Sequence, residues 1–327
     1  MSEIIVTGAA GFIGFHVAQA LLARGDQVLG LDSVNSYYDP ALKQARLKKF
    51  EGRNGFRFRQ VDIADPEALD AATSDALAKA KAIVHLAAQA GVRYSIEQPA
   101  EYARANLLGH FNMLELARRA PALEHMVYAS SSSVYGASKK VPFALDDPAD
   151  HPVSLYAATK RSDELLSISH ARIFKLPQTG LRFFTVYGPW GRPDMAYYKF
   201  TARILAGEPI DVYGAGELKR DFTYIDEIVK GVLAALDRPP RREEEEPHRI
   251  YNLGTDHPES VNDLVAAIEN ACGKKAIRLE KPMPAGDVPQ TWADISVSRR
   301  DLGYDPQMHL TDGIARFVAW YRDYAGV

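Results

Sequence analysis

Short apolar runs and longer amphipathic stretches alternate along the first 130 residues. The apolar runs predict strands at 4–7, 27–31, 56–61, 82–86 and 125–129, and the amphipathic stretches predict helices at 15–24, 66–80 and 97–119. Strands that alternate with helices in this way indicate a parallel sheet covered by helices on both faces. We therefore expect an α/β fold with a doubly wound parallel sheet.

The second half of the chain predicts further helices and one isolated strand. Helices are expected at 155–171, 195–207, 260–272 and 310–324, and a strand at 210–213. Residues 237–247 combine prolines with a run of charges, which is typical of a solvated surface loop. No internal repeat interrupts this order.

A glycine-rich turn links the first strand to the first helix. The turn reads Gly8-Ala-Ala-Gly11-Phe12-Ile13-Gly14, and Gly25 ends the helix that follows. Small residues let the backbone approach a pyrophosphate, and the helix N-terminus offers N–H groups and the positive end of its dipole. Strand, glycine turn and helix together predict a dinucleotide site in a Rossmann-type sheet.

Polar and small residues follow the other strands, at the sheet edge where ligands of such folds bind. Asp32 ends the second strand, where a carboxylate accepts hydrogen bonds from a ribose and disfavours a 2′-phosphate; this predicts NAD rather than NADP. Asp62 either contacts the adenine side or only caps its strand. The remaining candidates for cofactor contact at this edge are Ile63, Leu86, Ala87 and Ala88.

Tyr156 and Lys160 lie four residues apart on a predicted helix and so share one face. A neighbouring ammonium favours the phenolate, which makes the tyrosine a candidate general base for an alcohol. Ser131, in the hydroxyl-rich stretch 130–133, is the candidate that hydrogen-bonds the same substrate oxygen. Taken alone, such a pair is more often an exposed helix face, and the serines a simple turn.

Composition narrows the possible partners. The 327 residues are 46% hydrophobic and 25% charged with a net charge of −3, which gives no reason to expect nucleic acid. No apolar run is long enough for a membrane span, no signal peptide is recognisable, and no histidine spacing suggests a metal. One cysteine, Cys272, fits a reducing compartment, so we expect a cytoplasmic protein.

These motifs together resemble the extended short-chain dehydrogenase/reductases that act on nucleotide sugars. The matching stretches are T-G-A-A-G-F-I-G (7–14), Asp32, Asp62-Ile63, H-L-A-A (85–88), Asn106, S-S-S-S-V-Y-G (130–136), Y-A-A-T-K (156–160), R-F-F-T-V-Y-G-P (182–189), K-R-D-F-T-Y-I-D (219–226) and A-G-D-V-P-Q-T-W-A-D (285–294). Within that family, residues 87–95, 182–196 and 209–226 resemble UDP-glucuronate 4-epimerases.

The resemblance implies tightly bound, recycled NAD+, with Asn106 and Lys160 among its contacts. It implies a Rossmann domain over residues 1–180, with returning segments near 220–255, and a smaller C-terminal α/β lobe within 181–327 that binds the UDP-sugar. It also implies a homodimer formed by two helices per subunit, near 97–119 and 155–171.

Candidate substrate contacts follow from the resemblance and from the chemistry of a carboxylate. An arginine fork or short hydroxyl donors suit a uronate, so Arg192, Thr185 and Ser132 are candidates, and Arg93 is a weaker one. Arg192 could instead serve the diphosphate or pair with Asp194. The remaining candidates are Tyr213 near the uracil, unless it is a core tyrosine, Arg220 near the diphosphate, and Asp287. The chain lacks the arginine that often precedes the Gly286-Asp287 pair in sugar epimerases.

The stretch around Ser132 separates two sister reactions. Dehydratases and decarboxylases of the family typically carry acids where this chain has Ser132 and Ser133, so the sequence favours epimerisation over decarboxylation. We expect a UDP-glucuronate 4-epimerase. The alternatives are a UDP-hexose or UDP-N-acetylhexosamine 4-epimerase, then a UDP-glucuronate decarboxylase, and, in a different class, an NAD(H)-binding sensor without activity.

Overall fold

A seven-stranded sheet in which every neighbouring pair is parallel forms the centre of the protein. The computed structural model describes residues 2–282 and 288–327. In spatial order the strands are β10 (His248–Leu253), β6 (Gln178–Phe183), β5 (His125–Ser131), β4 (Ala80–His85), β1 (Glu3–Thr7), β2 (Gln27–Asp32) and β3 (Phe56–Gln60). The order reverses beside β1, and such a reversal creates the crevice in which α/β sheets bind ligands.

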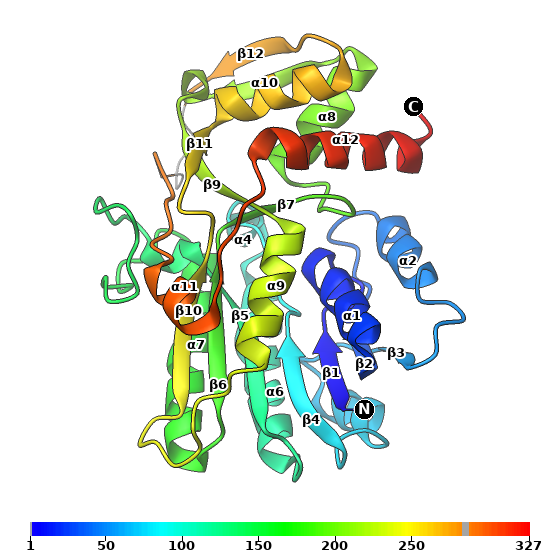
Figure 1. Ribbon diagram of the computed structural model, residues 1–327, viewed down its shortest axis with the longest axis vertical. Helices are drawn as coiled ribbons and strands as arrows, with labels where there is room; N and C mark the ends of the chain where they lie inside the picture. The colour runs from blue at the N-terminus through cyan, green and yellow to red at the C-terminus, as the bar shows by residue number, and fades with distance from the viewer. Residues whose placement is uncertain (1, 283–287) are drawn as a thin grey trace.

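Helices cover both faces of this sheet, as the alternating pattern predicts. One face carries α1 (Phe12–Arg24), α9 (Ile225–Leu236) and α11 (Ser296–Leu302); the other carries α3 (Pro66–Thr73), α6 (Gly109–Arg119) and α7 (Leu155–Phe174). Figure 1 shows α1 and α9 in front of the strands and α6 behind them. The interiors of β1, β2, β4 and β5 are mostly apolar, and the predicted doubly wound α/β fold is confirmed.

A smaller lobe sits above the carboxyl ends of the strands (Figure 1). It contains a two-stranded parallel sheet, β8 (Pro209–Tyr213) with β12 (Ile277–Lys281), and the helices α8 (Ala196–Ala206), α10 (Val261–Cys272) and α12 (Leu310–Ala325). Between the lobe and the large sheet runs a three-stranded sheet of β7 (Thr185–Tyr187), β9 (Lys219–Tyr224) and β11 (Pro258–Ser260). No helix in the described ranges is long and apolar enough to cross a membrane.

Local sequence signals set several helix ends. α1 stops at Gly25, which adopts φ 95°, a left-handed conformation that costs glycine little. α7 starts at Ser154, whose hydroxyl accepts the Ala157 N–H, and α10 starts at Ser260, which forms a reciprocal capping box with Asp263. α2 (Pro40–Lys48) begins with proline after Asp39, whose carboxylate caps it. These caps fix where the segments leave the sheet edge.

The helix predicted at 66–80 is too long. α3 ends at Thr73, residues 74–79 form turns, and Ala80 already pairs with Glu3 in the large sheet. The alanine-rich stretch favours helix locally, but the chain must reverse to deliver β4 to the sheet. Tertiary pairing therefore overrides the helical propensity.

The long helix predicted at 97–119 is interrupted. α4 (Tyr94–Glu97) ends before Gln98, which has φ −130° and ψ 63°, and α5 (Pro99–Tyr102) restarts the helix. Proline disfavours a helical residue before it and has no N–H to donate, so the break falls at this position. A π-helical segment, Ala103–Leu108, then leads into α6.

The buried histidine His125 predicts how the unfolding free energy depends on pH. His125 is 2% exposed, with Nδ1 against the Leu236 carbonyl at 3.1 Å and Nε2 against the Thr179 hydroxyl at 2.9 Å. Burial lowers its pKa from 6.5 to about 4, so below pH 6.5 the unfolded chain binds a proton that the folded chain excludes. Folding therefore loses stability as pH falls from 6.5 toward 4, by roughly 2 kcal/mol at pH 5 from this group.

We expect His125→Gln, which cannot take up this proton, to shrink the difference in unfolding free energy between pH 7 and pH 5 by about that amount. Urea unfolding at both pH values measures it. His257→Gln, at an exposed position, is the control for replacing a histidine by glutamine. Equal pH dependence in wild type and His125→Gln would contradict the assignment.

Candidate functional site

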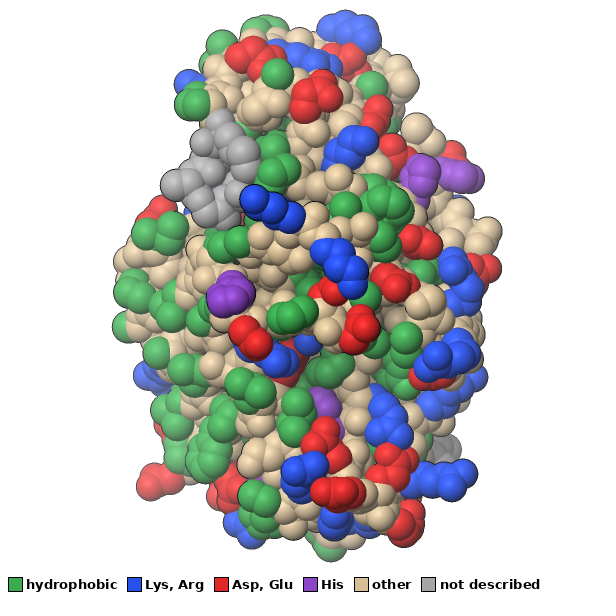
Figure 2. Space-filling model, turned by 90° about the vertical axis from the view of Figure 1, so that its left-hand side faces the viewer, with side chains coloured by type: hydrophobic (Ala, Val, Ile, Leu, Met, Phe, Trp, Pro, Cys, Tyr) green, Lys and Arg blue, Asp and Glu red, His purple; other side chains and the backbone are tan. Residues whose placement is uncertain are grey.

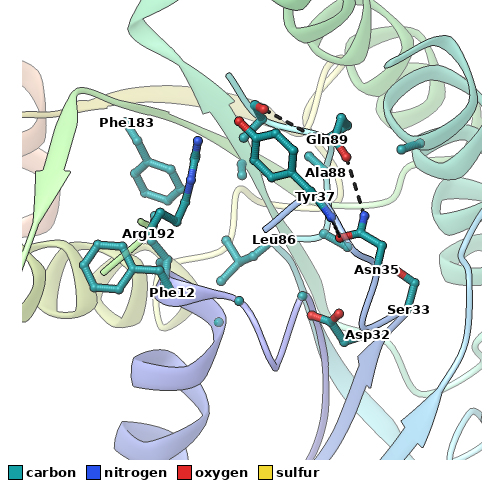
Figure 3. A pocket seen from close by; sticks show the side chains of 18 of the residues that line it. Phe12, Asp32, Ser33, Asn35, Tyr37, Leu86, Ala88, Gln89, Phe183 and Arg192 are labelled. Carbon is teal, nitrogen blue, oxygen red and sulfur yellow. Dashed lines mark hydrogen bonds between the residues drawn. The ribbon is translucent and has the colours of Figure 1, made fainter. Parts of the chain in front are cut away.

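A pocket opens at the carboxyl ends of the parallel strands, beneath the smaller lobe. Most of the residues predicted to bind the cofactor line it: Gly8, Gly11, Phe12, Ile13, Gly14, Asp32, Asp62, Ile63, Leu86, Ala87, Ala88, Tyr156 and Lys160. Ser131 and Arg192 line it as well. Figure 3 shows Phe12, Phe183 and Arg192 on one side of the pocket and Asp32 with Ser33 on the other. The fold thus brings residues from distant parts of the chain into one cavity.

The glycine turn fits a group that must approach the backbone closely. Gly8 has φ 71°, and a Cβ on Gly14 would stand 2.0 Å from the Gly8 carbonyl oxygen. At the start of α1, Gly11 provides no side-chain cap, and the first turn carries no acidic residue. The N–H groups at this helix end are therefore available to an anion such as a pyrophosphate.

Asp32 is buried beside the turn. Its two oxygens accept the N–H of Ala10 at 3.1 Å and of Val34 at 2.8 Å, and Lys43 Nζ lies 3.8 Å away. Burial is the main cause that lowers the pKa of Lys43, with Asp32 opposing it. The carboxylate keeps lone pairs for a ribose hydroxyl, because each oxygen can accept more than one hydrogen bond.

Asp62 caps its strand end and also lies at the pocket. Oδ1 accepts the Ala64 N–H at 2.9 Å, as in a strand-end cap, and Oδ2 accepts Arg104 Nη2 at 2.6 Å. The residue nevertheless lines the pocket, so contact with a cofactor stays a prediction.

Asn106 does not line the pocket. It is buried, and its amide accepts the Gln89 N–H at 2.8 Å and donates to the Gln89 carbonyl at 3.1 Å and the Thr159 hydroxyl at 3.0 Å. The side chain thereby fastens the loop after β4 to α7. The structure places it as a support for the pocket wall, one layer behind the predicted contact.

Tyr156, Lys160 and Ser131 all line the pocket. Lys160 is 3% exposed, and its ammonium donates to the Ala129 carbonyl and to Asp163 Oδ2, both at 3.0 Å. Burial is the main cause that raises the pKa of Asp163 to about 6, and Lys160 opposes it. Ser131 ends β5 with its hydroxyl 3.2 Å from the Ser133 N–H. A cation, a phenol and a hydroxyl in one cavity are suited to taking a proton from an alcohol.

Arg192 reaches the pocket from the loop between β7 and α8. The anticipated pair with Asp194 is present, with Nε–Oδ1 at 3.0 Å and Nη2–Oδ2 at 2.6 Å. Burial opposes ionisation of Asp194, but the guanidinium outweighs it and keeps the pKa of this carboxyl below its usual value. Arg192 therefore pairs with Asp194 and also lines the pocket.

The other candidate substrate contacts among the described residues are not part of this set of lining residues. Ser132 and Thr185 are half-buried, just after β5 and at the start of β7. The Arg93 guanidinium lies 4.9 Å from the ring centre of Tyr213, a cation–π contact that joins the loop after β4 to the upper lobe. Tyr213 is half-buried and is not a core residue. Arg220, on β9, donates to the Lys219 carbonyl at 2.8 Å, and Asp287 lies outside the described residues.

Several lining residues escaped sequence reasoning. The most polar are Asn35, Tyr37, Lys43 and Gln89, and the apolar ones include Phe183, Phe184 and Met195. Asn35 and Tyr37 lie in the loop just after Asp32 and the end of β2. Ligands bind at the carboxyl ends of parallel strands, so this position could have marked both residues as candidates. Among the described residues no cluster of histidine, cysteine or carboxylate side chains could hold a metal ion.

The fold and the site define a nucleotide-dependent α/β protein of the Rossmann type. The model of the NAD dependent epimerase/dehydratase family matches residues 4–254, and the chain belongs to this family.

Similar proteins match this chain over nearly its whole length. A probable UDP-glucuronate 4-epimerase of Rhizobium meliloti is 46% identical over 330 residues, which span 97% of this chain and 96% of the relative. A UDP-glucuronic acid 4-epimerase of Bacillus cereus, solved with UDP-glucuronic acid and NAD, is 33% identical with a TM-score of 0.90 over 98% of this chain and 99% of that one. A UDP-glucose 4-epimerase of Thermotoga maritima, solved with UDP-glucose, is 30% identical with a TM-score of 0.88 over 99% of both chains.

The close contact at Gly14 predicts that any side chain at this position destabilises the protein. Gly14→Ala places a methyl group on the Gly8 carbonyl, so the turn must open, and we expect a loss of roughly 1–3 kcal/mol of unfolding free energy. Chemical denaturation measures it. Gly303→Asn is the control, because Gly303 has φ 66° with open space around it and asparagine tolerates that conformation. Equal stability of Gly14→Ala and wild type would contradict the described turn.

Proposed function

We propose that this protein inverts carbon 4 of UDP-glucuronate to give UDP-galacturonate, reversibly, with tightly bound NAD+. The supporting observation is that the glycine turn, Tyr156 with Lys160 and Ser131, and Arg192 line one pocket. The names of the Rhizobium and Bacillus relatives support the same substrate. The division into a Rossmann domain (1–180 with segments near 220–255) and a UDP-sugar lobe within 181–327 belongs to this proposal.

The residues present fit NAD. The close approach at Gly8 and Gly14, the open N-terminus of α1 and the buried Asp32 suit a pyrophosphate and a ribose without a 2′-phosphate. NAD bound there would supply the acceptor and donor of the hydride at carbon 4. In an epimerisation the hydride removed from carbon 4 returns to the same carbon, so one cofactor molecule suffices for many cycles.

The protein's own groups handle the proton and the orientation of the sugar. Tyr156 removes the proton of the 4-hydroxyl, Lys160 stabilises the phenolate, and Ser131 hydrogen-bonds the sugar oxygen. The 4-keto sugar then presents its other face, and Tyr156 returns the proton. Arg192 supplies N–H donors for the uronate carboxylate, with Ser132 and Thr185 as further hydroxyl donors at the ends of β5 and β7.

Two serines explain why epimerisation is favoured over loss of CO2. A 4-keto glucuronate is a β-keto acid, and decarboxylation is helped by acid/base groups beside the sugar. Ser132 and Ser133, in the turn after β5, carry no carboxylate. This turn thus has no carboxylate at the two positions where the sister enzymes carry their acid/base residues.

The first experiment is incubation of the purified protein with UDP-glucuronate, without added NAD, followed by proton NMR. We expect the anomeric signal of UDP-galacturonate and no UDP-pentose. Formation of UDP-pentose would show that the serines do not protect the keto acid. No reaction with UDP-glucuronate but reaction with UDP-glucose or UDP-N-acetylglucosamine would assign the protein to the neutral-sugar epimerases.

Tyr156→Phe removes the proton acceptor and should lower the rate by about 10²–10⁴-fold, while NAD remains bound. The rate of UDP-galacturonate formation and the absorbance of released NAD measure the two properties. Tyr321→Phe, on α12 and away from the pocket residues, is the matched control. An unimpaired Tyr156→Phe enzyme would exclude this tyrosine as the base.

The homodimer implied by the resemblance is part of the proposal, as is a cytoplasmic location. Large apolar side chains are exposed on the π-helical segment, α6 and α7: Leu108, Phe111, Leu165, Leu166, Ile173 and Phe174. Hydrophobic side chains gather on this side of the molecule in Figure 2. Such an apolar face is typical of a protein–protein interface.

We expect Phe111→Asp combined with Leu165→Asp to convert the dimer into a monomer, because two charges would be buried at the interface without partners. Light scattering of the eluting protein measures the mass. Ile277→Asp, at an equally exposed apolar position on β12, should remain a dimer. A wild-type monomer at micromolar concentration would contradict the assignment.

A further inference from the structure

The guanidinium of Arg192 is held in place by an ion pair. Asp194 occupies Nε and Nη2 through two hydrogen bonds of 3.0 and 2.6 Å. An arginine has five N–H donors in one plane, and this pairing uses two of them. It also fixes the plane in which the remaining donors lie.

Asp194 is itself held by a residue from another part of the chain. The Tyr37 hydroxyl donates to Asp194 Oδ2 at 3.1 Å, and the Arg192 guanidinium lies 5.9 Å from the centre of the Tyr37 ring. Burial, opposed in part by the Arg192 charge, raises the pKa of Tyr37 to about 12, so the hydroxyl keeps its proton and donates at neutral pH. Tyr37 lines the pocket, and Figure 3 shows it across from Arg192.

The ring of Tyr37 has little freedom to move. It packs on Tyr94 with ring centres 4.8 Å apart, and a Cβ on Gly91 would stand 2.5 Å from its hydroxyl oxygen. Gly91 has φ 104°, so the loop after β4 comes close enough to confine the hydroxyl. The donor to Asp194 is therefore positioned by packing.

The backbone of the Arg192 loop is anchored separately. His16 on α1 contacts the Pro189 carbonyl at 3.0 Å, and Arg46 on α2 donates to the Trp190 carbonyl at 2.6 and 3.1 Å. These contacts hold the path of the loop without touching the guanidinium. Tyr37 and Asp194 are left to control the direction of the side chain.

We propose that Tyr37, acting through Asp194, orients the Arg192 guanidinium and thereby sets the preference of the pocket for a UDP-uronate over a neutral UDP-hexose. The inference rests on the proposed function, because Arg192 is the carboxylate reader there. Tyr37 is a positioning residue in this account. A planar fork binds a carboxylate well only in a narrow range of angles, and a neutral hydroxymethyl group makes no such demand.

The test is isothermal titration of the NAD-loaded protein with UDP-glucuronate and, separately, with UDP-glucose. Tyr37→Phe keeps the ring and its packing but removes the donor to Asp194. We expect its Kd for UDP-glucuronate to rise roughly tenfold, and its Kd for UDP-glucose to stay within about twofold of wild type, as for the loss of a hydrogen bond to a charged group.

Tyr304→Phe is the matched control. The buried Tyr304 hydroxyl donates to the Gly254 carbonyl at 2.9 Å, so the variant also loses one hydrogen bond. Tyr304 is not among the residues that line the pocket. We expect both dissociation constants of this variant to match wild type. Retained NAD in each variant, measured by absorbance after denaturation, shows that the cofactor site is intact.

Asp194→Asn supplies a second measurement. It removes the charge that pairs with Arg192, and we expect a larger loss of uronate preference than in Tyr37→Phe. Tighter binding of UDP-glucuronate by Asp194→Asn would show that Asp194 competes with the substrate for Arg192 and would overturn the proposal. Equal weakening of both ligands in Tyr37→Phe, or no change, would also overturn it. A wild-type protein that binds both sugars equally well would instead refute the proposed uronate specificity itself.

Discussion

One buried cation joins the two halves of the pocket. Arg46 is fully buried, and its guanidinium donates to the Ala10 carbonyl in the glycine turn, to the Tyr38 hydroxyl and to the carbonyls of Trp190 and Gly191. All these acceptors are neutral oxygens. A buried charge is costly unless its donors are satisfied, so this set of segments must stay together for the arginine to be tolerated. The dinucleotide turn and the Arg192 loop are thereby held in one arrangement.

A second buried charge network supports the edge of the sheet at the pocket. Glu164 on α7 accepts Ser130 Oγ at 2.6 Å and the Arg182 guanidinium at 2.8 and 2.9 Å. Burial alone would raise the pKa of Glu164, but Arg182 lowers it below its usual value. The bonds tie α7, which carries Tyr156 and Lys160, to the ends of β5 and β6. The positions of Tyr156 and Ser131 relative to each other thus depend on this buried network.

The sequence predicted that the glycine turn and the Tyr156–Lys160 pair lie at the pocket, because both motifs are local. A glycine turn between strand and helix, or a tyrosine and lysine one turn apart, depends on neighbours within a few residues. The same reasoning erred where distant pairing decided the outcome. Helix α3 ends early because Ala80 pairs with Glu3, which lies 77 positions away in the chain.

Side-chain partners across the chain were also beyond prediction. Nothing in the order of residues links Tyr37 to Asp194, or Arg93 to Tyr213, because each pair forms only when the loops above the sheet meet. Asn106 shows the same limit: the resemblance implies contact with the cofactor, but nothing in the sequence predicted that its amide also bonds the Gln89 backbone.

By itself, the sequence determined the doubly wound parallel sheet, the glycine turn and the candidate base, because hydrophobic periodicity and short-range sterics are written into neighbouring residues. Only the tertiary structure decided which side chains share the pocket and how Arg192 points. Those choices depend on desolvation and hydrogen-bond geometry between segments that approach each other only in the folded chain.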